Sequence, residues 1–370
     1  MSTAPEVVDA LCNRDGRVRR ARCGRAVGNW RGRRRAESLT GMSLALVVGE
    51  FCPPVMADLA LVHDAARLAD GVAVLVVDRE DDAVPAPVRV AWLSRALPGV
   101  AVAALVAADA AAPSVVERTL GARPTVVAGA VGLADAWRAR VLDDAGTLAE
   151  RERARRDPVG AWGELLATVR GGLTRRICFV GAESSGKTTL SRLMAGRHGT
   201  TWVPEYGRDY TVDKIAEGTN DHWDTDDFVM IARRQGELED DTAEGAGPLL
   251  FCDTDAFATA IWHERYLHFR TTLVEEIANA RRYDLYVLCG IDVPFEADGV
   301  RFSEYIRPWM QQRFREGLRS RPFCEPWIEL TGSIDERVRA LEAAIARAGL
   351  LDGASMLAAS RWAPAVRPVR

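Results

Sequence analysis

The segment "GAESSGKTTL" has the glycine and lysine spacing of a phosphate-binding loop. Gly181, Gly186, Lys187 and Thr188 match the pattern G-x-x-x-x-G-K-[ST], with a strand-like apolar run before it and a helical pattern after it. Glycines at these positions let several backbone N–H groups turn toward an anion, and the N-terminus of the following helix adds partial positive charge. The motif therefore predicts a site for the phosphates of ATP or GTP.

The lysine of this motif is unusual in this chain. Only two of the 48 basic side chains are lysines, Lys187 and Lys214, and the others are arginines. An ammonium group is a compact charge on a flexible stem that can reach the β- and γ-phosphates, whereas a guanidinium is a rigid planar fork. The residues expected to bind the nucleotide are Gly181, Ser184, Ser185, Gly186, Lys187, Thr188 and Thr189.

A carboxylate for Mg²⁺ is predicted where the apolar run "PLLFC" ends. Asp253 follows this run, in the place where a strand-end carboxylate holds the shell of Mg²⁺ in P-loop enzymes, and Thr188 would supply a hydroxyl ligand. The structural alternative for Asp253 is a cap at the start of the next helix. Mg²⁺ is therefore an expected cofactor, together with ATP or GTP.

Glu205 and Arg208 of "EYGRDY" are expected near the end of a neighbouring strand. Ligands of a doubly wound sheet gather outside the carboxyl ends of its strands, which would bring Glu205 beside the γ-phosphate. A carboxylate there can accept the proton of a hydroxyl group that attacks phosphorus. Arg208 would position substrate or phosphate, or form a surface ion pair with Asp209 or Glu205.

The segment "ADGVRFSEYIR" carries Asp298, Arg301 and Arg307 between a strand and an aromatic-rich helix. Small kinases often use such a segment as a lid that covers the transferred phosphoryl group and excludes water. The spacing alone leaves a polar surface loop open as the alternative.

Composition narrows the class of protein. A chain of 370 residues, 48% of them apolar, is long enough for two domains with separate cores. Its net charge of −4 argues against nucleic acid or a membrane surface as a partner of the whole chain. No apolar run approaches the roughly 18 residues of a membrane span, and no secretory signal is visible. The seven cysteines stand singly, which indicates reduced thiols in a cytoplasmic protein.

Short β-branched runs alternate with helical patterns through most of the chain, which predicts parallel sheets with crossover helices. We expect the fold class α/β, with two doubly wound parallel-sheet domains. The expected strands are "LALVVG", "VAVLVVD", "VAVAALVA" and "PTVVAG" in the first domain, and "RRICFVG", "TTWVPEYG", "PLLFCDTD", "YDLYVLCG" and "WIELTG" in the second.

The motifs "GAESSGKTTL", "EYGRDY", "FCDTDAFAT" and "ADGVR", in this order, resemble the ribosylnicotinamide kinase domain of NadR-type proteins. The resemblance implies transfer of the γ-phosphoryl group of ATP to the 5′-hydroxyl of nicotinamide riboside. Glu205 or Asp253 would be the base, Lys187, Thr188 and Mg²⁺ would stabilise charge on the phosphates, and Arg301, with Arg307 as a second candidate, would close over them.

The substrate of that family carries a cationic pyridinium ring, for which aromatic faces and carboxylates are suitable partners. The family often has tryptophan before the lid where this chain has Phe295, which weakens the assignment of the ring. The candidates for substrate binding are Tyr206, Arg208, Tyr210, Asp255, Trp262 and Asp298, and a core or capping role is the alternative for the aromatic residues and Asp255.

NadR-type proteins also carry an adenylyltransferase domain with the pattern G-[KR]-F-x-P-x-H-x-G-H, which this chain has lost. The corresponding segment reads "GEFCPPVMAD", with Glu50 in place of the basic residue and Asp58 in place of the last histidine. Near the end of that domain, "AERERAR" stands where the family has I-S-x-T-x-I-R. The two carboxylates would repel a triphosphate, so we expect a nucleotidyltransferase-like Rossmann domain without activity.

The expected organisation has five parts. They are a disordered arginine-rich extension over residues 1–41, the degenerate adenylyltransferase-like domain over 42–150, a linker over 151–173, the P-loop kinase-like domain over 174–348, and a tail over 349–370. The extension could also be upstream sequence before a start at Met42, or, less favoured, an arm that binds nucleic acid.

Two other functions stay open at this point. The second domain could phosphorylate another nucleoside, or it could be an ATP-gated regulator whose first domain binds a partner. A small-molecule nucleoside is the expected partner in the first case, and a homo-oligomer is compatible with either. No helix-turn-helix module is recognisable in the sequence.

Overall fold

The computed structural model describes residues 43–219, 222–296, 304–321 and 326–358. Contacts within the chain divide it into two compact units, and the division falls between Glu152 and Arg153. Each unit is built on its own five-stranded sheet. The predicted fold class, α/β with two doubly wound parallel-sheet domains, is confirmed.

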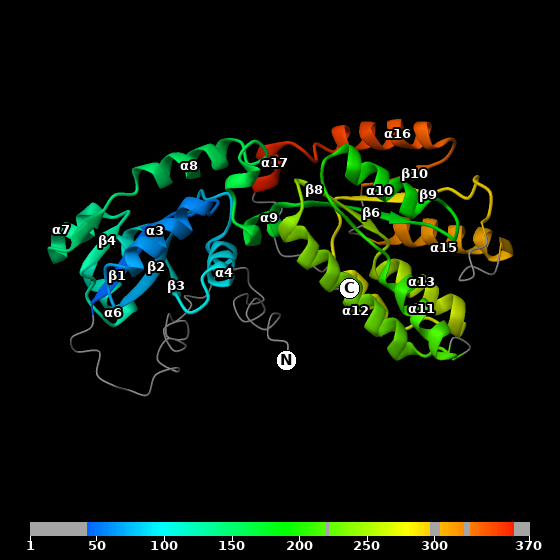
Figure 1. Cartoon of the computed structure of the whole chain (residues 1–370), viewed down its shortest axis with the longest axis horizontal. Helices are drawn as coiled ribbons and strands as arrows, with labels where there is room; N and C mark the ends of the chain where they lie inside the picture. The colour runs from blue at the N-terminus through cyan, green and yellow to red at the C-terminus, as the bar shows by residue number, and fades with distance from the viewer. Residues whose placement is uncertain (1–42, 220–221, 297–303, 322–325, 359–370) are drawn as a thin grey trace. The chain divides into compact units, whose positions relative to one another are not determined.

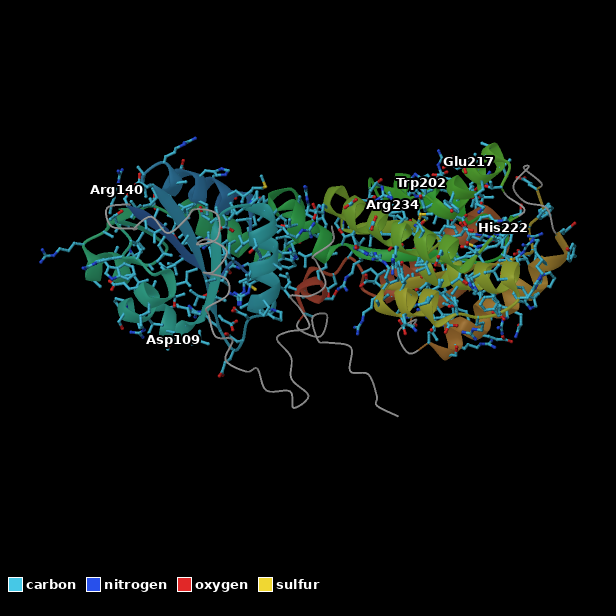
Figure 2. All side chains as sticks on the ribbon, turned by 90° about the horizontal axis from the view of Figure 1, so that it is seen from below. Asp109, Arg140, Trp202, Glu217, His222 and Arg234 are labelled. Atoms are coloured by element: carbon cyan, nitrogen blue, oxygen red, sulfur yellow. The ribbon has the colours of Figure 1, made fainter. Side chains whose placement is uncertain are left out.

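The sheet of the first unit has the strand order β3-β2-β1-β4-β5, and every pair of neighbouring strands is parallel. Its strands are β1 (Leu44–Gly49), β2 (Gly71–Asp78), β3 (Ala101–Val106), β4 (Val126–Ala128) and β5 (Arg140–Leu142). The first four coincide with the expected apolar runs. Only the short edge strand β5 was not predicted, and Arg140 of this strand is exposed (Figure 2).

Helices connect these strands, and one helix follows the last of them. They are α3 (Met56–Ala66), α4 (Ala86–Ala96), α5 (Ala107–Ala110), α6 (Pro113–Leu120), α7 (Val131–Trp137) and α8 (Ala145–Arg156). One core cluster joins Leu46 and Leu75 of the sheet to Val116, Leu133 and Trp137 of α6 and α7. Successive side chains along β1 and β2 point to opposite faces of the sheet. The side chains that alternate with the cluster members therefore face α3 and α4.

The second unit has the strand order β10-β9-β6-β8-β7, again with parallel neighbours. Its strands are β6 (Arg175–Val180), β7 (Trp202–Val203), β8 (Leu249–Asp253), β9 (Leu285–Cys289) and β10 (Trp327–Leu330). Three of them, β6, β8 and β9, are buried along almost their whole length. That burial explains their continuous apolar sequences, since a central parallel strand is covered on both faces.

The helices of the second unit cover both faces of its sheet. They are η1 (Trp162–Glu164), α9 (Ala167–Leu173), α10 (Lys187–Arg197), α11 (Tyr206–Glu217), α12 (Thr225–Gly245), α13 (Ala256–Leu267), α14 (Thr272–Ala280), η2 (Glu304–Ile306), α15 (Arg307–Ser320), α16 (Ile334–Arg347) and α17 (Gly353–Leu357). Helices α10 and α16 lie on one side of the sheet, and α12, α13 and α15 lie on the other (Figure 1).

Each face has its own core. On the α10 side, Leu190 and Met194 pack with Phe251 of the sheet and Leu341 of α16. On the opposite side, the cluster joins strand residues to apolar side chains of four helices; among its members are Cys178, Leu250, Leu288, Phe228, Ile261, Val274 and Phe314. Full burial of a leucine, isoleucine, valine, methionine or phenylalanine side chain stabilises the folded state by about 1.5–3 kcal/mol relative to exposure. The two cores therefore hold the helices against the sheet.

The predicted linker over residues 151–173 is largely helical. It contains the end of α8, the turn η1 and the helix α9, whose Val169 and Leu173 are buried. The Trp162 indole N–H donates to the Ala246 carbonyl over 2.8 Å. The segment after the predicted domain end at residue 348 is also folded, since α17 buries Met356 and Leu357. Residues 1–41, the predicted extension, lie outside the described residues.

The four cysteines at positions 52, 178, 252 and 289 are buried and carry free thiols. Within the part of the chain that the structure describes, no helix combines the length and the apolar character that crossing a membrane requires.

A buried histidine makes the stability of the second unit sensitive to acid. The ring of His263 is fully buried between Phe228 and Phe269, with Nε2 3.0 Å from the Thr225 hydroxyl and Nδ1 3.0 Å from the Phe269 carbonyl. A neutral ring satisfies both contacts by donating from Nδ1 and accepting at Nε2. Burial lowers the pKa of His263 because it penalises the charged form.

We therefore expect the free energy of unfolding to decrease as the pH falls below about 6.5, the ordinary pKa of histidine in an unfolded chain. Above that pH both states are neutral at this position, so its contribution is constant. Denaturant titrations at pH 7.5 and 5.5 test this for the wild type and His263→Gln. The wild type should lose more stability on acidification than the variant; equal losses would contradict the assignment.

Candidate active site

The phosphate-binding loop connects β6 to α10 and has a backbone that requires glycine at two places. Gly181 has φ +141°, and a Cβ atom there would lie 2.7 Å from the Cys289 carbonyl oxygen. Gly186, the residue before α10, has φ +84°. L-residues with a side chain rarely adopt these angles, so the two glycines of the motif are explained by the path of the loop.

Two buried arginines hold the outer side of this loop. Arg307, at the start of α15, donates to the carbonyl oxygens of Ser184 (3.2 Å) and Val293 (3.0 Å). Arg337 of α16 donates to the Ser185 carbonyl over 2.8 Å. In a trans peptide the N–H points away from the preceding C=O, so the N–H groups that follow Ser184 and Ser185 point away from the arginines, as an anion site requires.

Arg337 also joins the loop to the ends of two strands. Its side chain donates to the Gly290 carbonyl after β9 (3.3 Å) and the Gly332 carbonyl after β10 (3.0 Å), and it pairs with Asp292 at 2.7 Å. The residue is only 3% exposed. One guanidinium therefore fixes three loops at the carboxyl edge of the sheet, where a doubly wound fold binds its ligand.

Lys187 and Thr188 begin α10 directly after the loop. The Lys187 ammonium is buried and donates to the carbonyls of Gly181 (3.1 Å) and Ala182 (3.0 Å). The Thr188 hydroxyl donates to Asp253 at the end of β8 over 2.5 Å. Thr189 is exposed on the first turn of α10. The predicted residues of the phosphate site thus occupy one edge of the sheet.

The Thr188 hydroxyl and the Asp253 carboxylate have the chemistry of a Mg²⁺ site. Both are oxygen donors, which this ion prefers, and they approach each other closely. Among the described residues, no group of three or more His, Cys, Asp or Glu side chains is arranged to hold a metal alone. These two residues fit an ion that keeps several waters and binds phosphate oxygens, which is the usual behaviour of Mg²⁺ in P-loop enzymes.

A cleft opens beside the loop, with about 750 Å³ of empty space including its open mouth. The lining residues are Glu183, Lys187, Glu205, Gly207, Arg208, Thr211, Trp223, Phe228, Ile231, Gln235, Thr254, Thr259, Trp262 and Tyr266. The structure therefore brings Lys187, Glu205, Arg208 and Trp262, all predicted from the sequence, to one cavity.

Glu205 is the residue before α11, and a buried glutamine fixes the backbone on both sides of it. The Gln235 side chain accepts the N–H of Tyr206 over 2.9 Å and donates to the Pro204 carbonyl over 3.3 Å. Gln235 belongs to α12 and is 1% exposed. This residue was not predicted from the sequence, although its place four positions after Ile231 and seven after Phe228, on the apolar face of a helix, was a signal for it.

Aromatic rings form one wall of the cleft. Trp223, Phe228 and Tyr266 contribute rings that were not predicted, and Trp262 contributes one that was. The ring centroids of Trp223 and Tyr266 are 5.0 Å apart, and those of Trp262 and Tyr266 are 6.1 Å apart. Such a wall offers π faces to a planar ring, and to a cation in particular.

Several predicted residues lie elsewhere. Asp255 is fully buried and caps α13, accepting from the Ala258 N–H (2.9 Å) and the Tyr286 hydroxyl (2.7 Å), which corrects its predicted substrate role. The rings of Tyr206 and Tyr210 lie 6.3 Å apart, outside the lining of the cleft, and the Tyr210 hydroxyl donates to Asp227 over 2.5 Å.

The predicted lid falls only partly within the described residues. Arg307 binds the phosphate loop from outside, which corrects its predicted place over the phosphates. Asp298 and Arg301 lie outside the described residues. Ser184 contacts the segment that leads to them, since its hydroxyl accepts from the Glu296 N–H over 2.9 Å.

In the first unit, an ion pair between Asp58 and Arg151 occupies the space beside the altered motif. Asp58 is completely buried in the first turn of α3, accepts the Val55 N–H over 2.7 Å and is bound by the Arg151 Nε over 2.7 Å. The Arg151 guanidinium lies 4.5 Å from the Phe51 ring centre, and a Cβ atom at Gly49 would lie 2.7 Å from its Nη1.

The other carboxylate of the altered motif, Glu50, pairs with Arg79 at 2.8 Å. From the sequence, Glu50 and Asp58 were expected to repel a triphosphate. The structure changes that reason, because both charges have partners and the Arg151 side chain occupies the space beside Gly49.

Known proteins share part of this sequence and the fold. Residues 176–337 match the model of the AAA domain family described as "AAA_28". The chain is 30% identical over 147 residues to the trifunctional NAD biosynthesis/regulator protein NadR of Escherichia coli K12, and equally to that of Salmonella typhimurium LT2. The match covers 40% of this chain and 36% of each relative, so the chain spans about a third of the length of the curated relatives it matches.

Two solved structures share the fold over most of the chain. A NadR protein in complex with NR has a TM-score of 0.68 and 19% identity, with 85% of this chain and 98% of that chain covered. A NadR protein with NAD and AMP-PNP has a TM-score of 0.65 and 18% identity, covering 84% and 97%. The resemblance to NadR-type proteins is confirmed.

The role of Arg337 predicts a specific effect on nucleotide binding. Arg337→Met removes the donors that hold the Ser185 carbonyl and the strand ends, and each lost hydrogen bond to a charged group costs on the order of 1–3 kcal/mol. We expect the dissociation constant of ATP, measured by calorimetry, to rise about tenfold or more. Arg339→Met, at an exposed position of the same helix, is the control and should bind ATP as the wild type does. Unchanged affinity in Arg337→Met would contradict this role.

Proposed function

We propose that this protein is an ATP-dependent kinase that phosphorylates the 5′-hydroxyl of nicotinamide riboside and forms nicotinamide mononucleotide. The observation that carries the proposal is the cleft in which the P-loop Lys187 and the carboxylate-bearing Glu205 line the same space as an aromatic wall. The partial identity to the NadR regulators named as NAD biosynthesis proteins supports the same substrate class.

The residues divide the chemistry between them. Glu205 accepts the proton of the ribose 5′-hydroxyl as its oxygen attacks the γ-phosphorus, and the bond from that phosphorus to the β,γ-bridging oxygen breaks to release ADP. Lys187 and the loop N–H groups stabilise the charge on the phosphates. Asp253 is a poorer base because it accepts from the Thr188 hydroxyl. Mg²⁺, held by Thr188 and Asp253, would neutralise phosphate charge when bound.

The cleft suits a flat cationic ring attached to ribose. Two carboxylates, Glu183 and Glu205, line it together with the rings of Trp223, Trp262 and Tyr266. Carboxylates and aromatic faces each stabilise a pyridinium. Arg208, on the first turn of α11, would position the substrate or its new phosphate. We also propose that Asp298 and Arg301 contribute to the lid that completes the site.

For the first unit we propose a scaffold without adenylyltransferase activity. Support comes from the buried Asp58–Arg151 pair and from the absence of histidine in "GEFCPPVMAD". An anion would have to displace a paired carboxylate from the N-terminus of α3, where Asp58 already accepts the Val55 N–H.

A panel of nucleosides tests the substrate assignment. With ATP and Mg²⁺, we expect kcat/KM for nicotinamide riboside to exceed that for uridine, cytidine and adenosine by about a hundredfold, because only the pyridinium gains from both carboxylates and rings. Product formation is measured by chromatography. Efficient turnover of another nucleoside with none of nicotinamide riboside would refute the assignment.

Glu205→Gln separates a kinase from an ATP-gated regulator. Loss of the proton acceptor should reduce kcat by about 10²–10⁴-fold and leave the affinity for ATP near that of the wild type. Glu217→Gln, exposed at the far end of α11 (Figure 2), is the matched control and should keep full activity. Equal phosphoryl transfer by Glu205→Gln and wild type would mean that Glu205 is not the base. A wild type that binds ATP but transfers no phosphoryl group to any nucleoside would favour the regulator.

A further inference from the structure

One cation beside the cleft has no part in the mechanism above. Arg265 of α13 lies against the aromatic wall, with its guanidinium carbon 4.7 Å from the ring centre of Tyr266 and 5.6 Å from that of Trp262. Its Nη2 atom lies 3.9 Å from Oε1 of Glu183 in the phosphate-binding loop. Arg265 therefore contacts two of the aromatic rings and one of the two carboxylates that a cationic substrate would use.

The Arg265 side chain is largely buried among its neighbours. Its side chain is 17% exposed and that of Glu183 is 6% exposed, so their interaction is only weakly screened by water. Tyr266, which the guanidinium covers, packs in turn against Trp223 and Phe228. A charge at this depth influences a ligand in the cleft more strongly than a surface charge does.

The charges that line the cleft are otherwise balanced. The lining includes the carboxylates of Glu183 and Glu205 and the cations of Lys187 and Arg208. Arg265 adds a third positive charge next to Glu183. The strength of the cleft's preference for a positively charged ring therefore depends in part on this guanidinium.

We propose that Arg265 is a specificity-determining residue that sets how strongly the cleft prefers a positively charged nucleoside ring to a neutral one. The proposal rests on the proposed function, since it concerns the substrate of the same site. Arg265 competes with a cationic ring for Glu183 and for the faces of Tyr266 and Trp262, and it repels that ring directly. A neutral ring of the same shape is not repelled, so the guanidinium lowers the preference of the cleft for a cationic ring over a neutral one.

The test compares two ribosides that differ in ring charge. Nicotinamide riboside has a cationic ring, and its 1,4-dihydro form has a neutral ring of nearly the same size. For the wild type and each variant, the ratio of kcat/KM for the cationic riboside to that for the neutral riboside is measured. In Arg265→Gln we expect this ratio to rise about tenfold. In Glu183→Gln we expect it to fall, because that variant removes a carboxylate that would bind the cationic ring of the riboside.

Two further variants control for packing and for general charge. Arg265→Lys keeps the charge near the rings, so its ratio should stay within about threefold of the wild type; this variant also remains informative if Arg265→Gln folds poorly. Arg270→Gln removes a cation that pairs with Glu275 at an exposed place after the same helix, and its ratio should not change.

The outcomes separate the two proposals. If the wild type phosphorylates neither riboside, the proposed function is wrong and the inference about Arg265 is wrong with it. If the wild type accepts them but the ratio in Arg265→Gln stays within about twofold of the wild type or falls, the proposed function stands and the role of Arg265 is refuted.

Discussion

The anchoring of the phosphate-binding loop by buried arginines is the interaction on which the rest of the second unit depends. Carbonyl groups of the loop have to point away from a bound phosphate, and at Ser184 and Ser185 the donors that satisfy them come from Arg307 and Arg337. Arg307 begins α15 and Arg337 lies in α16, and these two helices pack on opposite faces of the sheet. The packing of both faces is thus connected to the conformation of the loop, because each guanidinium belongs to a helix that packs on one face of the sheet.

The same edge of the sheet explains why the chemistry gathers where it does. Strands β6, β8 and β7 are neighbours, so the loop after β6, Asp253 at the end of β8 and Glu205 after β7 meet although they are far apart in the sequence. In the first unit, the equivalent edge is occupied by the Asp58–Arg151 pair. In both units the side chains that follow the strands meet at the carboxyl edge of the sheet. They leave an open cleft in the second unit and fill the corresponding space in the first.

Much of this organisation could be predicted from the sequence, because it depends on local patterns. The buried strands have continuous apolar sequences, and the motif around Lys187 has a fixed relation to its strand and helix. What could not be predicted depends on long-range packing. Asp255 and Glu205 both stand just before a helix, yet only the fold decides that Asp255 is buried under Tyr286 and that Glu205 faces the cleft. The partners Gln235, Arg265 and Arg337 come from helices whose apolar spacing says nothing about the contacts of their polar residues.

The central claim is that the γ-phosphoryl group moves from ATP to the ribose in this cleft, and following phosphorus by ³¹P nuclear magnetic resonance tests it most directly. The full-length protein is incubated with ATP, Mg²⁺ and nicotinamide riboside, and the phosphorus signals are recorded over time. The account predicts that a 5′-phosphomonoester and ADP appear at equal rates. Formation of ADP with free inorganic phosphate, while the riboside stays unchanged, would contradict it.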